Sequence, residues 1–149
     1  MDFPIAIPFV HAMGFELLRM QDGEAELALQ LRADQHNSMH MAHGGVTMTL
    51  LDVTMATAAR SVQKDMGVVT IEMKTSFMQP APGDGSRLTA KGRLIHRTAT
   101  LAFTEATLHD ASGKACAHAT GTFKYVKRLI SAARTVNGLS VPEAPISTD

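Results

Sequence analysis

One long apolar helix, predicted for residues 44–63, constrains the fold more than any other part of this 149-residue chain. Valine, methionine, leucine and alanine occupy nearly every face of the segment, unlike a surface helix with one polar side. A helix that is apolar almost all round must be buried, and the chain is long enough to bury it. The remaining segments must therefore surround this helix.

Six strand-like segments can do so. Two flank Gln21-Asp22-Gly23, and the second of them, residues 24–32, alternates polar and apolar residues as a half-buried antiparallel strand does. Four more follow the helix, at residues 68–78, 87–96, 101–109 and 114–125. Asp110-Ala-Ser-Gly113 is a hairpin turn between the last two. We therefore expect an α+β domain in which a curved antiparallel sheet wraps around one helix.

The N-terminal end of the chain is predicted to be structured and the C-terminal end to be flexible. A short helix is expected at residues 5–13, with Pro4 in its first turn and Gly14 at its end. Periodicity stops after residue 128, so we expect one domain over residues 1–128 and a flexible, non-catalytic tail over 129–149. A single curved sheet leaves its edges unprotected, which favours a homo-oligomer.

Composition excludes several classes of protein. The 14 Lys and Arg balance the 14 Asp and Glu, which argues against a nucleic-acid partner held by bulk positive charge. Cys116 is the single cysteine, so no internal disulfide forms, as in proteins of a reducing compartment. Neither a signal peptide nor a run of about 18 apolar residues is visible, so we expect a cytoplasmic protein with no membrane partner.

Potential chemistry is concentrated at the start of the long helix. His43-Gly44-Gly45 opens it, and glycine there lets the backbone approach a ligand while the free N–H groups attract negative charge. Asp52 lies about 12 Å further along the axis. A carboxylate is costly in such an apolar helix. Either a hydrogen bond to a neighbouring strand or to Thr49 accounts for it, or Asp52 has a function.

Four ordered motifs carry a family resemblance. The first comprises Asn37, His43-Gly44-Gly45 and Asp52, and the others cover residues 69–81, 92–97 and 119–123. Together they span residues 10–127, and the series resembles the hotdog-fold acyl-CoA thioesterases of the phenylacetate-degradation (PaaI) type. The resemblance implies the hotdog fold and hydrolysis of an acyl- or aryl-acyl-CoA thioester to free acid and coenzyme A. It further implies no metal or redox cofactor, and a homodimer or dimer of dimers with active sites between subunits.

The resemblance also assigns catalytic roles. Thioester hydrolysis needs an attacking group and a stabilised oxyanion. By the resemblance, the Gly44 N–H polarises the carbonyl and Asp52 acts as general base or nucleophile. Asn37 would hold the carbonyl or the attacking water, and Thr70 would orient that water. Both of the latter also have ordinary explanations, since Asn forms turns and Thr forms strands.

Binding residues follow in the same way. His43 is expected to shape the site with Gly45 and not to transfer protons. His96 and Arg97 are expected to bind the nucleotide part of coenzyme A, whose phosphates attract cations. The apolar acyl pocket is expected to draw on Met48, Met55, Met73, Phe77 and Met78.

One alternative site and two departures from the family's sequence pattern bear on this prediction. A metal site made of His36, His40 and His43 is not expected, because their spacing is loose and no Cys or carboxylate ligand is nearby. His40 stands where related sequences commonly have glycine, which could narrow the acyl pocket or alter the loop. Residues 98–100 lack the family's Gly and Arg, which bears on phosphate binding.

Two rival functions use the same fold. A non-catalytic protein that binds acyl-CoA or an aromatic ligand would need neither Asp52 nor Asn37. A hotdog dehydratase would need a histidine and an acid arranged for proton abstraction beside a carbonyl, which the position of Asp52 fits poorly.

Overall fold

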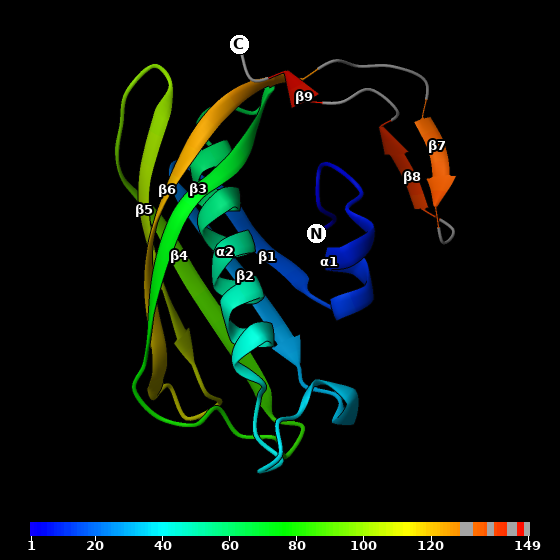
Figure 1. Ribbon diagram of the computed structural model, residues 1–149, viewed down its shortest axis with the longest axis vertical. Helices are drawn as coiled ribbons and strands as arrows, with labels where there is room; N and C mark the ends of the chain where they lie inside the picture. Colours follow the sequence, from blue (N-terminus) through cyan, green and yellow to red (C-terminus); the bar gives the residue numbers. More distant parts are fainter. Residues whose placement is uncertain (129–132, 137–138, 143–145, 148–149) are drawn as a thin grey trace.

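The computed structural model describes residues 1–128, 133–136, 139–142 and 146–147. An antiparallel sheet curves around the long helix α2, Gly44–Arg60 (Figure 1). Its strands run in the order β1-β2-β4-β5-β6-β3, and the short β9 pairs with the end of β6. This is the hotdog fold, and it confirms the expected α+β architecture.

Strands β1 to β6 agree with the six predicted strands to within a few residues, whereas β7, β8 and β9 were not predicted. The strands are β1 Glu16–Gln21, β2 Glu24–Gln30, β3 Met66–Phe77, β4 Arg87–Arg97, β5 Leu101–His109, β6 Ala115–Arg128, β7 Ala133–Val136, β8 Leu139–Pro142 and β9 Ile146–Ser147. The last three lie within the predicted tail, and β7 pairs with β8. Residues 129–132, 137–138, 143–145 and 148–149 lie outside the described residues, so tail flexibility stays a prediction.

The first helix begins later than expected. Helix α1 spans Pro8–Met13, so Pro8 and not Pro4 occupies its first turn. The residue before a proline is driven out of the helical region, and Ile7 is accordingly extended, with φ −117° and ψ 107°. Gly14 ends the helix with φ 78°, as expected. Residues 1–7 therefore precede the helix as a non-helical segment.

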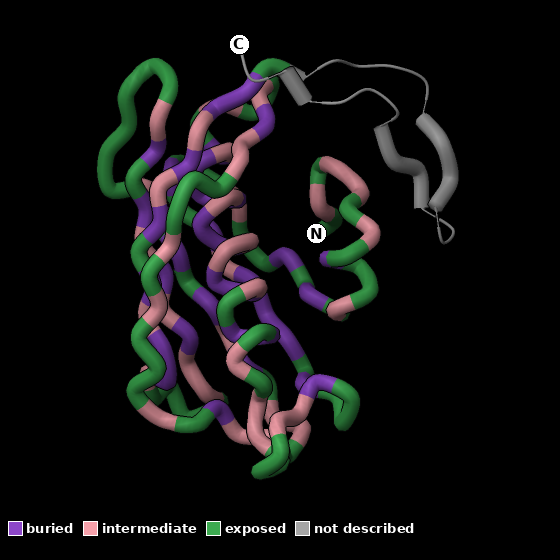
Figure 2. The backbone as a smooth tube through the Cα atoms, viewed as in Figure 1, coloured by how far each residue is buried: buried purple, intermediate pink, exposed green. Residues whose placement is uncertain are grey.

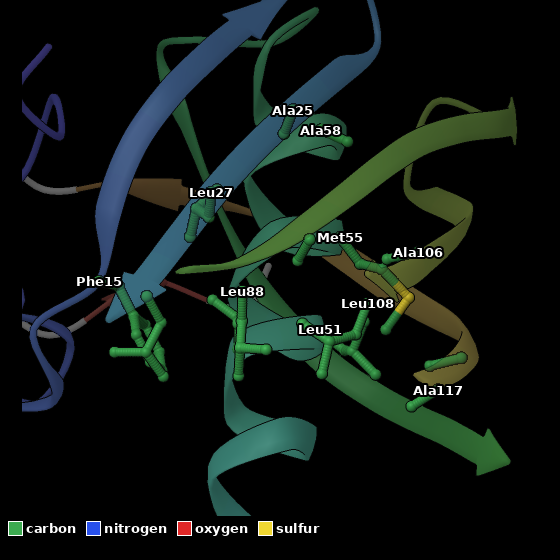
Figure 3. Packing of buried hydrophobic residues seen from close by; sticks show 14 of the residues in the cluster. Phe15, Ala25, Leu27, Leu51, Met55, Ala58, Leu88, Ala106, Leu108 and Ala117 are labelled. Atoms are coloured by element: carbon green, nitrogen blue, oxygen red, sulfur yellow. The ribbon is translucent and has the colours of Figure 1, made fainter. Parts of the chain in front are cut away.

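The inner face of α2 packs into the concave side of the sheet. Leu51, Met55 and Ala58 have no exposed surface, and Figure 3 shows them among side chains of β2, β4, β5 and β6. The sheet contributes Leu27, Leu88, Ala106, Leu108 and Phe123, each of which is at most 1% exposed. Burial of this aliphatic surface is the main favourable term in folding.

Two glycines let α2 lie close to the sheet. A Cβ atom on Gly92 of β4 would be 2.9 Å from Thr54 Cγ2, and one on Gly121 of β6 would be 3.0 Å from Met55 Cε. Both distances are shorter than ordinary van der Waals contact. A side chain at Gly92 would push the helix outward, whereas one at Gly121 would first displace the end of the Met55 side chain.

Strand β3 is the outermost strand of the main path beyond β6. Its outer edge has no strand partner among the described residues, and Ile71 on it is 54% exposed. An exposed edge of this length is a template for pairing with another chain. No helix in the described part of the chain is long and apolar enough to cross a membrane.

Candidate active site

Asp52 projects from the middle of α2 toward β3. Thr70 Oγ1 donates a hydrogen bond to Asp52 Oδ1 at 2.7 Å, and the register of β3 shifts just after Thr70, at a β-bulge. Thr49 instead donates to the Gly45 carbonyl at 2.7 Å. Of the two ordinary explanations for Asp52, the bond to a neighbouring strand is present and the bond to Thr49 is not.

The environment of Asp52 favours its neutral form. Burial raises the pKa of the Asp52 carboxyl, and the hydrogen bond from Thr70 partly opposes this effect. Within the described residues, Oδ2 has no hydrogen-bond partner. A carboxylate with a raised pKa and one free oxygen is suited to accept a proton or to attack a carbonyl.

Asp52 and Thr70 open onto a cavity of about 600 Å³. Its lining is mainly apolar and comes from the N-terminal segment, α1, β1, α2, β3 and β6. Met48 and Met73 line it, as expected for an acyl pocket, whereas Met55 is fully buried in the core. Phe77 and Met78 do not line it and are more than half exposed. The sequence did not predict that the N-terminal segment contributes to the lining of the cavity.

The His43-Gly44-Gly45 turn forms the N-terminus of α2. The His43 Nδ1 atom accepts a hydrogen bond from the Gly45 N–H at 2.9 Å and so caps the helix. His43 thus holds its own turn through Nδ1, and its expected role in shaping the site stays a prediction. The Gly44 N–H has no acceptor among the described residues and points from the positive end of the helix. It can therefore receive the oxygen of a ligand.

Gln35 holds this turn in place, a role that sequence reasoning missed. Its backbone carbonyl accepts the His43 N–H at 2.9 Å. Its buried side chain donates to the Met13 carbonyl at 2.8 Å and accepts from the Arg32 N–H at 3.0 Å. A single glutamine in a polar loop carries no sequence signal that would have indicated these contacts.

Asn37 organises the loop before the turn. Its Oδ1 accepts hydrogen bonds from the backbone N–H groups of Met39 and Met41, at 2.9 and 3.1 Å. The ordinary turn-forming explanation therefore accounts for its oxygen. Its side-chain amide N–H is the group that could still meet a substrate carbonyl, and that role stays a prediction.

The loop that contains Ala81 and Gly83 packs against the loop that contains His40 and Ala42. The Ala42 N–H donates to the Ala81 carbonyl at 3.0 Å, and Gly83 approaches so closely that its Cβ would overlap the His40 carbonyl oxygen. His40 has φ 59°, a left-handed conformation that glycine adopts without strain. Its side chain is exposed and does not line the cavity, so the structure shows no narrowing of the pocket by His40.

Most of the candidate residues thus form two groups at two places along α2. Phe77 joins the Gly44 group, because its ring lies 3.5 Å from where a Cβ on Gly44 would be. Asp52 and Thr70 form the other group, about 12 Å along the axis of α2 from Gly44. Two hydrogen bonds of about 3 Å each cannot span that distance. Within one chain, Gly44 and Asp52 cannot hold the same thioester carbonyl.

His96 and Arg97 lie apart from both groups. The His96 ring stacks on Phe103 with centroids 6.2 Å apart, and the Arg97 guanidinium lies 5.7 Å from the centre of the Tyr125 ring. Tyr125 in turn donates to the carbonyl of Ala59, at the far end of α2 from Gly44. Neither His96 nor Arg97 lines the cavity, and their contact with coenzyme A stays a prediction.

The three histidines of the first loop form no cluster suited to a metal. The rings of His36 and His40 meet edge to face, with centroids 6.2 Å apart. His43 caps the helix through Nδ1. Across the described residues, no group of three His, Cys, Asp or Glu side chains could hold a metal ion.

Known proteins share this fold and part of the sequence. A protein of Saccharolobus solfataricus named for an inferred esterase activity is 26% identical over 117 residues, covering 78% of this chain and 82% of its own. A variant of the phenylacetic acid degradation protein PaaI of Thermus thermophilus is 27% identical, with a TM-score of 0.72 over 79% of this chain and 98% of its own.

A hypothetical thioesterase of Streptococcus pneumoniae, whose structure contains coenzyme A, is 22% identical. It superimposes with a TM-score of 0.70 over 76% of this chain and 90% of its own, a likeness that shows the fold alone. The family model described as the thioesterase superfamily matches residues 39–117, more than half of the chain. With the sheet, the helix and Asp52 in the arrangement described above, the chain belongs to the thioesterase superfamily.

Proposed function

We propose that the protein is an acyl-CoA thioesterase, which hydrolyses an acyl- or aryl-acyl-CoA thioester to the free acid and coenzyme A. One observation carries the proposal: Asp52, with its raised pKa and its bond to Thr70, faces a large apolar cavity. The coenzyme A bound to the streptococcal relative supports the choice of thioester. No metal or redox cofactor takes part, and the protein acts in the cytoplasm.

The ionised Asp52 carboxylate starts the reaction. As a general base it accepts a proton from water while the water oxygen bonds to the thioester carbon; as a nucleophile it bonds to that carbon itself. Negative charge develops on the carbonyl oxygen, which a Gly44 N–H stabilises. In the general-base route the carbon–sulfur bond then breaks, and the sulfur of coenzyme A leaves as a thiol that takes the proton held by Asp52. In the nucleophilic route the thiolate leaves first, and water then hydrolyses the acyl–Asp52 anhydride, which releases the acid, restores the carboxylate and protonates the thiolate.

A second copy of the chain completes each site. Because Gly44 and Asp52 of one chain lie too far apart, we infer that the Gly44 turn of one subunit faces Asp52 of its partner. The unpaired edge of β3 carries Thr70 and exposed Ile71, so pairing of two such edges would place the interface beside the site. A homodimer, or a dimer of dimers, follows from this arrangement.

The test is release of free thiol from a panel of acyl-CoA substrates, including phenylacetyl-, benzoyl-, short- and medium-chain thioesters. Asp52→Asn should abolish most of the activity, whereas Asp65→Asn, a matched change at an exposed aspartate outside the cavity, should leave it unchanged. Activity that survives in Asp52→Asn would refute the mechanism. Binding of coenzyme A thioesters without hydrolysis of any of them would favour the non-catalytic binding protein.

A further inference from the structure

Helix α2 presents one regular stripe to the cavity. Met48, Asp52, Ala56 and Arg60 all line it, and residues four apart lie on the same face of a helix. Each step rises about 6 Å along the axis. The residue one step beyond Asp52 is the small Ala56, so the cavity keeps its depth there. Phe123, which is fully buried, also contributes to the lining.

The N-terminal segment supplies the other side of the cavity. Phe3, Ile7 and Phe9 line it together with the α2 stripe, and Figure 1 shows this segment alongside α2 on the side away from β5. None of residues 1–9 is buried, as the green and pink tube in Figure 2 shows. Pro4 and Pro8 each fix one backbone angle of the segment. This side is therefore a single layer of chain with apolar side chains on it.

Apart from Asp52 Oδ2, the polar side chains of the lining already make hydrogen bonds. Thr57 Oγ1 donates to the Val53 carbonyl at 2.7 Å, and Thr49 and Thr70 make the hydrogen bonds described above. The Arg60 Nε donates to the Met66 carbonyl at 3.1 Å. Past Asp52, the surface offered to a ligand is therefore mainly carbon, which favours an apolar group over a charged one.

We propose that the N-terminal segment and Ala56 together set the length of the acyl group that the enzyme accepts. The inference rests on the proposed function, which places the thioester carbonyl at Asp52 and hence the acyl group in the cavity. The preferred substrate then carries an uncharged, apolar acyl group much longer than acetyl. Its far end lies between Ala56 of α2 and Ile7 of the N-terminal segment.

Hydrolysis of straight-chain acyl-CoAs from acetyl to dodecanoyl, followed by thiol release, tests the length dependence. Burial of one methylene corresponds to about a fourfold gain in kcat/KM. The value should therefore rise by about fourfold per methylene and then level off or fall once the chain reaches the end of the cavity. A kcat/KM that does not depend on chain length would overturn the proposal.

Two variants should move the optimum in opposite directions. Ala56→Leu fills the space beyond Asp52 and should shift it to shorter chains, with a loss of about tenfold or more for octanoyl relative to butanoyl. Ile7→Ala removes a side chain from the opposite side and should shift it to longer chains. The matched controls are Leu18→Ala, at a side chain that is 40% exposed against 44% for Ile7, and Ala111→Leu at an exposed turn. Neither control residue lines the cavity, and neither change should move the optimum.

Thermal denaturation of each variant establishes that it is folded, and calorimetric titration with octanoate gives a readout independent of turnover. Weaker octanoate binding in Ala56→Leu than in Ala111→Leu supports the proposal even if no thioester is hydrolysed. The absence of hydrolysis refutes only the proposed function. Hydrolysis of long-chain thioesters with an optimum that neither Ala56→Leu nor Ile7→Ala moves refutes the length-setting role and leaves the thioesterase assignment intact.

Discussion

Replacing Thr70 by valine removes the hydroxyl that holds Asp52 and little else. Valine has nearly the same shape, and both residues are β-branched, so β3 should keep its conformation. A hydrogen bond to a charged group contributes about 1.5 to 3 kcal/mol, and the lower figure applies here because Thr70 is exposed. A loss of about 1.5 kcal/mol corresponds to a decrease of about tenfold in kcat/KM.

Thr70→Val should also alter the pH dependence of kcat/KM. The Thr70 hydroxyl lowers the pKa of Asp52, against the effect of burial, so its removal leaves burial alone and raises that pKa further. Asp52 must be ionised to act, so activity is lost as the pH falls through its pKa. The acidic limb of the kcat/KM profile should therefore move to higher pH in Thr70→Val.

The assay is thiol release at saturating and limiting substrate over a range of pH, for wild type, Thr70→Val and Thr70→Ser. Serine keeps the hydroxyl, so Thr70→Ser should retain most of the activity and an acidic limb near that of the wild type. A Thr70→Val enzyme with unchanged kcat/KM and an unchanged acidic limb would refute the role given to this hydrogen bond. Equal losses in the valine and serine variants would do so too, since the loss would then come from packing.

Three other changes probe separate parts of the structure. Asp52→Asn should raise thermal stability at neutral pH. The pKa of Asp52 in the folded protein is raised above its ordinary value of 3.8, so the ionised carboxylate destabilises the fold at neutral pH, and asparagine removes that penalty. The gain should vanish near pH 3, where the carboxyl is neutral, and a gain independent of pH would contradict the reasoning. His43→Ala should lower the free energy of unfolding by about 1 kcal/mol, because it removes the helix cap, while His43→Asn should retain most of it in a urea titration; equal losses would show that the cap does not matter. Gly83→Ala should displace the loop that carries His40 and lower kcat, and a crystal structure of the variant with both loops unmoved would exclude this coupling.

The elements could be predicted because each is encoded locally. The apolar character of residues 44–63 and the alternation of residues 24–32 gave the helix and a strand directly. Positive φ angles at Asp22 and Gly23 form the turn that their sequence indicates. The predicted start of α1 was wrong. Either of two prolines could have occupied the first turn, and because Ile7 precedes Pro8 it is extended, so the helix begins at Pro8.

The site was predictable only in part, because its contacts join distant residues. A hydrogen bond between Asp52 and a neighbouring strand could be expected from the cost of a carboxylate in an apolar helix, but the choice of Thr70 as its donor could not, since the resemblance gave Thr70 a water-orienting role. The support of His43 by Gln35, and the N-terminal side of the cavity, depend on how loops pack after the sheet has curved. No periodicity encodes such contacts between loops.

The close approach of α2 to Gly92 and Gly121 has a consequence for how the chain tolerates change. Any side chain at Gly92 would meet the side chain and the carbonyl of Thr54 and lift or turn the helix, and Asp52 would move with it relative to Thr70 on β3. A side chain at Gly121 would meet the end of the Met55 side chain, which gives way more easily. A library screened for thiol release should therefore be depleted of substitutions at Gly92 about as strongly as at Asp52, and less strongly at Gly121. Selection on turnover would then protect a residue that touches no substrate.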